Sequence, residues 1–148
     1  METPLPADFK EFLRLLNSKG VRYLLVGGYA VALHGYVRST GGLDIWVDAD
    51  ARNAAKVAAA VTEFGFTAPD VTALLFEEAN QVIRMGVPPL RVEILTTISG
   101  VDFEACYKSR MTIEADGIAV PLLNLEHLKA NKRAAGRLKD LADLEQLP

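Results

Sequence analysis

Two acidic residues lie inside short apolar segments of the sequence. Asp44 is part of the segment L-D-I-W-V, and Glu93 is part of R-V-E-I-L. Both segments have the length and composition of β-strands, in which acidic residues are disfavoured. If the two strands are neighbours, their carboxylates converge and can bind divalent cations. Exposed carboxylates on half-buried strands are also ordinary, and each acid alone is compatible with that interpretation.

Position 42 matters because it shares a strand face with Asp44. Side chains alternate along a strand, so Leu43 and Ile45 would face the core while positions 42 and 44 face the other side. The two positions lie about 6.5 Å apart, close enough for two carboxylates to share metal ions. The residue at position 42 is glycine. The strand therefore offers one carboxylate where it has room for two.

A glycine pair, Gly27 and Gly28, follows the apolar run Y-L-L-V and precedes a short predicted helix that runs to His34. The first N–H groups of a helix have no partner within it, and glycine lets a phosphate approach the backbone closely. The pair is therefore a candidate phosphate site. A tight corner between a strand and a helix also explains two glycines, and on this feature alone it is the favoured explanation.

Five basic residues and no acidic residue lie within an eleven-residue stretch near the C-terminus: Lys129, Lys132, Arg133, Arg137 and Lys139. The first three have the i, i+3, i+4 spacing of one helical face. Such a face suits a triphosphate or an RNA backbone, so Lys132, Arg137 and Lys139 are candidate phosphate-binding residues. A solvated helix surface is the alternative, with Asp140 and Asp143 neutralising part of the charge.

Some other residues near the acidic strand have two interpretations each. Arg38, Ser39 and Thr40 precede it and are either phosphate contacts or loop residues. Trp46 is predicted on the Asp44 face, where it either stacks on a base or covers the sheet.

Length and composition restrict the fold and the compartment. A chain of 148 residues, half of them apolar, favours one compact domain over residues 1–148. The single cysteine, Cys106, excludes an internal disulfide, favours a buried structural thiol and fits a reducing, cytoplasmic setting. Without a basic and apolar leader or a run of roughly 20 apolar residues, we expect neither a signal peptide nor a membrane span. The net charge of −3 means that any anion site must be local.

The remaining elements mix helices with hairpin-paired strands. Spacing and caps predict helices over residues 6–18, 50–64, 102–108 and 124–135, a short helix within 71–78, and a last turn or two over 138–147. Hairpins are predicted over 81–95 and, through Asp116–Gly117, over 111–121. This mixture indicates an α+β (mixed α/β) fold, with a small mixed β-sheet flanked by helices and a helical C-terminus.

The segment from Gly27 to Val47 resembles the nucleotidyltransferase superfamily, which has the polymerase-beta-like fold. The motifs that carry the resemblance are G-G-Y-A-V-A-L-H-G and R-S-T-G-G-L-D-I-W-V. Two later segments, R-V-E-I-L-T-T-I-S-G-V-D-F-E-A and N-K-R-A-A-G-R-L-K-D-L-A-D-L, are similar to small stand-alone bacterial members. Those members are related to minimal nucleotidyltransferases and to the nucleotidyltransferase-like toxins of abortive-infection toxin–antitoxin systems. The resemblance covers residues 21–147.

The resemblance implies an activity and a set of site residues. Superfamily members hold two Mg²⁺ ions with three acids, transfer a nucleoside monophosphate from a nucleoside triphosphate to a hydroxyl, and release pyrophosphate. By position, Gly27 and Gly28 would hold phosphate. Asp44 would be the second acid of an Asp-x-Asp pair, and Glu93 would be the third acid. The implied partners are a nucleoside triphosphate, a protein or RNA acceptor, and a cognate toxin or antitoxin.

The chain departs from the superfamily pattern at Gly42, where the pattern has aspartate. Losing one of three carboxylates weakens metal binding. The chain then either binds a nucleotide or partner without turnover, or uses a single metal or another acid such as Asp48, or carries the glycine as a variant. We therefore expect a Mg²⁺-dependent nucleotidyltransferase-like protein, with a catalytically degenerate binding module of the same fold as the alternative.

Overall fold

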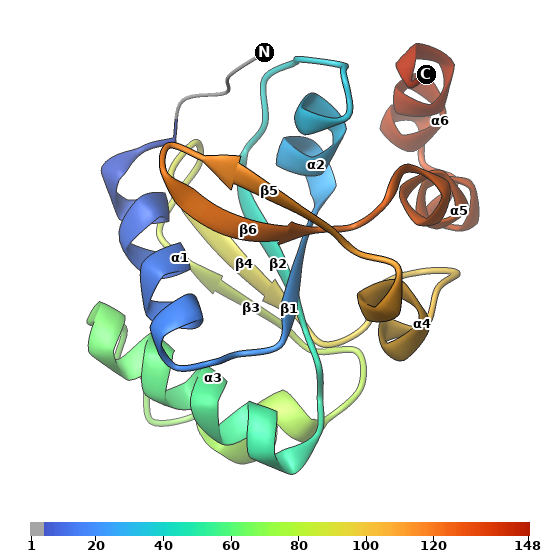
Figure 1. Cartoon of the computed structure of the whole chain (residues 1–148). Helices are drawn as coiled ribbons and strands as arrows, with labels where there is room; N and C mark the ends of the chain where they lie inside the picture. Colours follow the sequence, from blue (N-terminus) through green and yellow to red (C-terminus); the bar gives the residue numbers. More distant parts are fainter. Residues whose placement is uncertain (1–4) are drawn as a thin grey trace.

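The computed structural model in Figure 1 describes residues 5–148, among which six strands form one sheet in the order β3-β4-β2-β1-β6-β5. The strands are β1 Tyr23–Val26, β2 Gly42–Val47, β3 Val82–Met85, β4 Arg91–Leu95, β5 Met111–Ala115 and β6 Ile118–Leu122. β2 runs parallel to β4, and β1 runs parallel to β6. The other neighbouring pairs are antiparallel. The predicted mixed sheet and both predicted hairpins are confirmed.

Within the same described range, six α-helices and one 3₁₀-helix accompany the sheet. They are α1 Ala7–Ser18, α2 Gly27–Leu33, α3 Ala51–Phe64, η1 Ala73–Glu77, α4 Phe103–Lys108, α5 Leu125–Ala135 and α6 Leu138–Gln146. The short helix expected within 71–78 is thus a 3₁₀-helix. α1 packs against α3, and α5 packs against α6 on the opposite side of the view in Figure 1.

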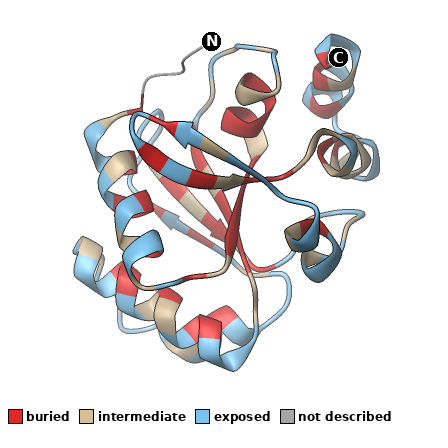
Figure 2. Cartoon of the chain, viewed as in Figure 1, coloured by how far each residue is buried: buried red, intermediate tan, exposed pale blue. Residues whose placement is uncertain are grey.

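The core follows the periodicities of the sequence. Leu43, Ile45 and Val47 are fully buried on one face of β2. α1 buries the four residues of its predicted apolar stripe, Phe9, Phe12, Leu13 and Leu16. Figure 2 shows buried residues concentrated in the strands and on the inner faces of the helices. α3 and α5 begin where the sequence predicts, because the side chains of Asp50 and Asn124 accept hydrogen bonds from backbone N–H groups of the first turn.

The C-terminal helix differs from the prediction in length, and it buries two aspartates. α6 has nine residues rather than a turn or two. Leu138 and Leu141 are 87% and 46% exposed, whereas Asp140 and Asp143 are 0% and 1% exposed. The aspartates face inward because cations from neighbouring segments pair with them there. Leu138 and Leu141 therefore do not lie on the buried face of this helix.

Three smaller expectations have outcomes in the structure. Trp46 covers the sheet: its ring packs edge-on against Phe103 with centroids 5.1 Å apart, and its indole N–H donates to the carbonyl oxygen of Thr96 at 3.4 Å. Cys106 is buried, as expected of a structural thiol. No helix among residues 5–148 has the length and apolar character needed to cross a membrane.

Candidate functional site

Asp44 and Glu93 lie side by side in the middle of the sheet. β2 and β4 are neighbours and run parallel, and the register places Asp44 directly beside Glu93. Both side chains point away from the face that buries Leu43 and Ile45. The alternation seen in the sequence is therefore correct, and the parallel pairing brings the two carboxylates together.

The environment of Asp44 disfavours its charged form. Burial raises the pKa of Asp44 to about 6, and the negative charge of Glu93 contributes to the increase. Lys139 and Lys132 act in the opposite direction but do not cancel it. A divalent cation between the two carboxylates would favour the charged form of both. The pair thus has the electrostatic character of a cation site.

Gly27 and Gly28 lie beside this pair and make room for it. A Cβ at Gly27, which has a φ of 69°, would overlap the carboxylate of Asp44. A Cβ at Gly28 would lie 2.5 Å from Oγ1 of Thr40. Both positions require glycine because other groups approach the backbone there, whether or not a phosphate binds.

One cavity of about 400 Å³ joins the acids, the glycines and a set of cations. Every site position predicted from the sequence lines it: Gly27, Gly28, Gly42, Asp44, Glu93, Lys132, Arg137 and Lys139. Arg38 and Arg91 also line it, so its described lining holds five cations and two acids. Arg91 was not among the site residues predicted from the sequence. Its spacing of two residues from Glu93, which puts both on one strand face, is the signal that identifies it.

Glu93 already has cationic neighbours. Its Oε1 lies 3.0 Å from Nε of Arg84 and 3.6 Å from Nη1 of Arg91. The Arg84 side chain is more than half exposed, so this ion pair is weak and gives way readily to another cation. Glu93 is therefore available to a metal ion at a small energetic cost.

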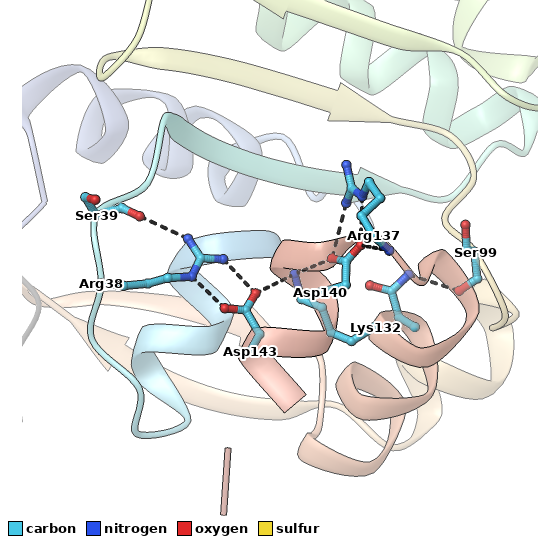
Figure 3. A network of polar contacts seen from close by, with 8 residues as sticks. Arg38, Ser39, Ser99, Lys132, Arg137, Asp140 and Asp143 are labelled. Carbon is cyan, nitrogen blue, oxygen red and sulfur yellow. Dashed lines mark hydrogen bonds and ion pairs between the residues drawn. The ribbon is translucent and has the colours of Figure 1, made fainter. Parts of the chain in front are cut away.

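Figure 3 shows that Lys132 belongs to a chain of ion pairs rather than to a solvated face. Its ammonium lies 3.1 Å from Oδ1 of Asp140 and 3.0 Å from Oδ2 of Asp143, and its side chain is 5% exposed. Lys129, Lys132 and Arg133 all lie in α5 as expected, but they have different environments. Arg133 is exposed, and Lys129 donates to the carbonyl oxygen of Pro148. The two aspartates fold back on Lys132 and draw it inside.

Arg137 and Lys139 reach the cleft from the start of α6. Nε of Arg137 donates to Oδ2 of Asp140 at 2.7 Å, while its side chain stays 63% exposed. Asp140 holds the pKa of Arg137 above its ordinary value, and the charges of Asp44 and Glu93 contribute. Lys139 lines the same cavity and lowers the pKa of Asp44. The two cations therefore lie in the electrostatic field of the acid pair.

A second cavity of about 640 Å³ adjoins the first, and both are lined by Gly27, Asp44, Lys132 and Arg137. The rest of its lining is uncharged and includes Asn80, Thr97, Ser99 and Asn131. Amide and hydroxyl groups of this kind form hydrogen bonds with neutral polar ligands. The cleft thus has a charged half and a neutral half, with Asp44 at their junction.

Solved structures share this arrangement of elements. A candidate nucleotidyltransferase from Thermotoga maritima matches with a TM-score of 0.62 and 19% identity, over 93% of this chain and 88% of that one. An antigenic nucleotidyltransferase-like protein from Paracoccidioides brasiliensis matches with a TM-score of 0.56 and 18% identity, over 97% and 77%. This chain has the nucleotidyltransferase fold. No family model and no curated protein sequence matches it.

In this nucleotidyltransferase fold, position 42 is closed to a side chain. Gly42 pairs with Arg91 across the parallel strands, and a Cβ there would overlap the carbonyl oxygen of Arg91. Asp48 does not replace the missing acid, because it binds Arg22 at 3.0 Å and does not line the cleft. The short distance between β2 and β4 is thus matched to glycine.

The donor set of this nucleotidyltransferase fold fits one magnesium ion and not two. Among residues 5–148, no group of three or more His, Cys, Asp or Glu side chains is placed to hold a metal. Mg²⁺ is commonly held by one or two carboxylates together with substrate phosphates and waters. Asp44 and Glu93 supply that pair, and the remaining ligands would come from the substrate.

Proposed function

We propose that this protein binds a nucleoside triphosphate with one Mg²⁺ ion and transfers the nucleoside monophosphate to a hydroxyl group. The observation that supports it best is the in-register pair Asp44–Glu93 in a cavity lined by five cations. A bound triphosphate requires both kinds of group, because carboxylates hold the metal and N–H donors hold the phosphate oxygens.

Each group in the cleft has one role in this proposal. The ion, when bound, neutralises charge on the phosphates and orients them for transfer. Asp44 and Glu93 hold the ion, and Asp44 must lose its proton to do so. Arg137 and Lys139 donate N–H groups to phosphate oxygens from one wall, and Arg38 donates from the other. The uncharged second cavity takes the nucleoside.

The acceptor and the partner rest on the sequence resemblance alone. We extend the proposal to a protein or RNA hydroxyl as the acceptor and to a cognate toxin or antitoxin as a partner. The charged half of the cleft supports the triphosphate without reference to either.

Calorimetry tests the proposal. The chain is titrated with each of the four nucleoside triphosphates, in EDTA and in Mg²⁺. We expect at least one to bind and Mg²⁺ to tighten binding. Asp44→Asn should weaken binding in Mg²⁺ by about tenfold or more, which is at least about 1.4 kcal/mol. The control variant is Asp8→Asn, which removes an exposed carboxylate from α1. If none of the four nucleotides binds in either condition, the proposal is wrong.

A binding module without turnover is the second candidate. It is favoured by Gly42, because the approach of the Arg91 carbonyl leaves no space for a third carboxylate. Incubation with triphosphates labelled at the α-phosphate separates the two candidates. Release of pyrophosphate with label transferred to an acceptor supports catalysis. Tight nucleotide binding without pyrophosphate release, when water, RNA or protein is supplied as the acceptor, supports the binding module.

A further inference from the structure

Five alternating charges form a continuous chain beside the cleft (Figure 3). In order they are Arg38, Asp143, Lys132, Asp140 and Arg137. The chain joins the loop before β2 to α6, to α5 and to the residue that precedes α6. Each aspartate binds two cations, and Lys132 is shared between the aspartates. The network therefore connects two arginines that both line the cleft, Arg38 and Arg137.

Stability alone does not explain this network. Both aspartates are almost fully buried, and their pKa values are held below the ordinary range by the cations that bind them. Buried ion pairs are often no more stabilising than apolar side chains of similar volume. On the same helix, Leu138 and Leu141 remain exposed to solvent. A helix that buries two aspartates and exposes two of its three leucines is not arranged for apolar burial alone.

The geometry of the arginines indicates what the network does. Arg38 donates from Nε to Oδ1 of Asp143 at 2.7 Å and from Nη2 to Oδ2 at 2.8 Å. This two-point contact fixes the plane of the guanidinium. The remaining nitrogen, Nη1, lies 3.3 Å from the Cβ position of Gly28, at the wall of the cleft. Nη1 donates to the carbonyl oxygen of Ser39 and keeps a second N–H for another acceptor.

Arg137 is held in a similar way by Asp140. Its Nε donates to Oδ2 of Asp140 at 2.7 Å, and its Nη2 lies 3.3 Å from Oδ1. Its side chain is mostly exposed and lines both cavities. Each aspartate thus binds one edge of a guanidinium group, and the remaining N–H groups of that arginine can bind a ligand in the cleft.

We propose that Asp140 and Asp143 are positioning residues that orient Arg137 and Arg38 for binding the phosphates of the substrate. The inference rests on the proposed triphosphate site. An arginine that is already oriented loses less side-chain entropy when it binds, so the site gains affinity. Lys132 is the common counter-ion that keeps both buried aspartates charged.

The direction in which anion affinity changes when an aspartate is removed distinguishes a positioning role from an effect of net charge. Removing a carboxylate near an anion site strengthens anion binding if only net charge matters. Removing a positioning carboxylate weakens it. We therefore measure the affinity of the full chain for inorganic tripolyphosphate by calorimetry in EDTA. Asp143→Asn is expected to weaken binding by about tenfold. Glu145→Gln, which removes an exposed carboxylate from the same helix, should change it less than about twofold.

A second pair of variants separates positioning from a general structural effect. Arg38→Lys keeps the charge but cannot make the two-point contact. It should weaken tripolyphosphate binding about as much as Asp143→Asn. If Asp143 acts through Arg38, then Asp143→Asn in the Arg38→Lys background adds less than about twofold. Independent losses that multiply would contradict the inference.

Each outcome decides something. If Asp143→Asn does not fold, the Arg38→Lys variant tests the positioning role instead, because it leaves the contacts of Lys132 intact. If Arg38→Lys binds tripolyphosphate as tightly as the natural chain does, the positioning role is wrong. If the natural chain binds tripolyphosphate and Asp143→Asn binds it equally or more tightly, only the positioning role is wrong. If the natural chain binds no tripolyphosphate in EDTA, this inference is wrong, whereas the triphosphate site is decided separately by the nucleotide titrations in Mg²⁺.

Discussion

Two pairs of acids in this protein are withdrawn from water in opposite electrostatic settings. On α6, Asp140 and Asp143 are each bound by two cations, and their pKa values are lowered. On the sheet, Asp44 stands beside a second acid, Glu93, and its pKa is raised to about 6. The first pair is satisfied within the chain. In the second pair Glu93 has Arg84 and Arg91 beside it, but Asp44 has no ion-pair partner among residues 5–148, so the pair is not fully satisfied.

The different electrostatic settings of the two acid pairs predict different roles, one in fixing side-chain positions and the other in binding a cation. A satisfied pair contributes fixed positions and has no remaining affinity for a ligand charge. An unsatisfied pair lowers the stability of the free protein and recovers that energy when a cation binds, which is characteristic of functional sites. This contrast agrees with the two proposals made above, in which Asp44 and Glu93 hold the metal ion and Asp140 and Asp143 orient Arg137 and Arg38.

The largest expected effect comes from making the satisfied pair unsatisfied. Lys132→Met removes the cation shared by the two buried aspartates. Breaking a buried ion pair from one side costs about 3–5 kcal/mol, because the remaining charge stays buried. We expect a loss of this size in the free energy of unfolding, measured with urea at pH 7.

Arg133→Met is the matched control for that variant, since it removes an exposed cation from the same helix. Its free energy of unfolding should change by no more than about 0.5 kcal/mol. Equal losses in the two variants would mean that the network is not a special feature of α6, and the comparison would fail.

The next effect concerns the pH dependence of the unsatisfied pair. The folded pKa of Asp44, about 6, lies above its ordinary value of 3.8. The folded state then binds more protons than the unfolded state between these values, so stability falls as pH rises from about 4 to about 6. Asp44→Asn removes this dependence. Without metal, the variant should be about 2–3 kcal/mol more stable than the natural chain at pH 7.5 and nearly equal at pH 3.5.

The satisfied pair should show the opposite sign. The lowered pKa values of Asp140 and Asp143 give stability that is present above about pH 4 and lost as pH falls below it. Urea unfolding of the natural chain and Asp44→Asn across pH 3–8 measures both effects, with Asp8→Asn as the control. An Asp44→Asn variant that is no more stable at pH 7.5 would show that Asp44 is not strained in the free protein.

The sequence predicts the unsatisfied pair better than the satisfied pair. Alternation alone places Asp44 and Glu93 on the faces opposite their strand cores, because the strand period is local. Only their register requires the structure, since nothing local specifies that β2 and β4 are neighbours. Arg91 is predictable from the same local alternation, because it lies two residues before Glu93 and therefore on the same strand face.

The orientation of α6 was not predictable from its own sequence. Asp143 is bound by Arg38, which lies 105 residues away in the sequence, so no local pattern indicates that this aspartate faces inward. The glycines before α2 show the same limit. Their pattern suggests a phosphate turn, whereas the space they leave is taken by Asp44 and Thr40, which come from other segments. In both cases the local structure depends on a contact with a residue that is distant in the sequence.

The smallest expected effect comes from adding a third acid to the unsatisfied pair. Gly42→Ala and Gly42→Asp both force β2 away from the carbonyl oxygen of Arg91, which should cost about 1–3 kcal/mol of stability in EDTA. Gly42→Asp should lose about 1 kcal/mol more than Gly42→Ala, because it adds a like charge beside Asp44 and Glu93.

Magnesium distinguishes these two variants, since thermal unfolding in Mg²⁺ should recover stability in Gly42→Asp and leave Gly42→Ala unchanged. If Gly42→Ala is as stable as the natural chain, β2 and β4 separate freely and position 42 is open to a side chain. If Mg²⁺ does not raise the thermal stability of Gly42→Asp, the acids on this sheet do not form a cation site. A recovery specific to Gly42→Asp would show that the geometry for a second metal-binding carboxylate on β2 persists, although the natural chain has only Asp44 on that strand face.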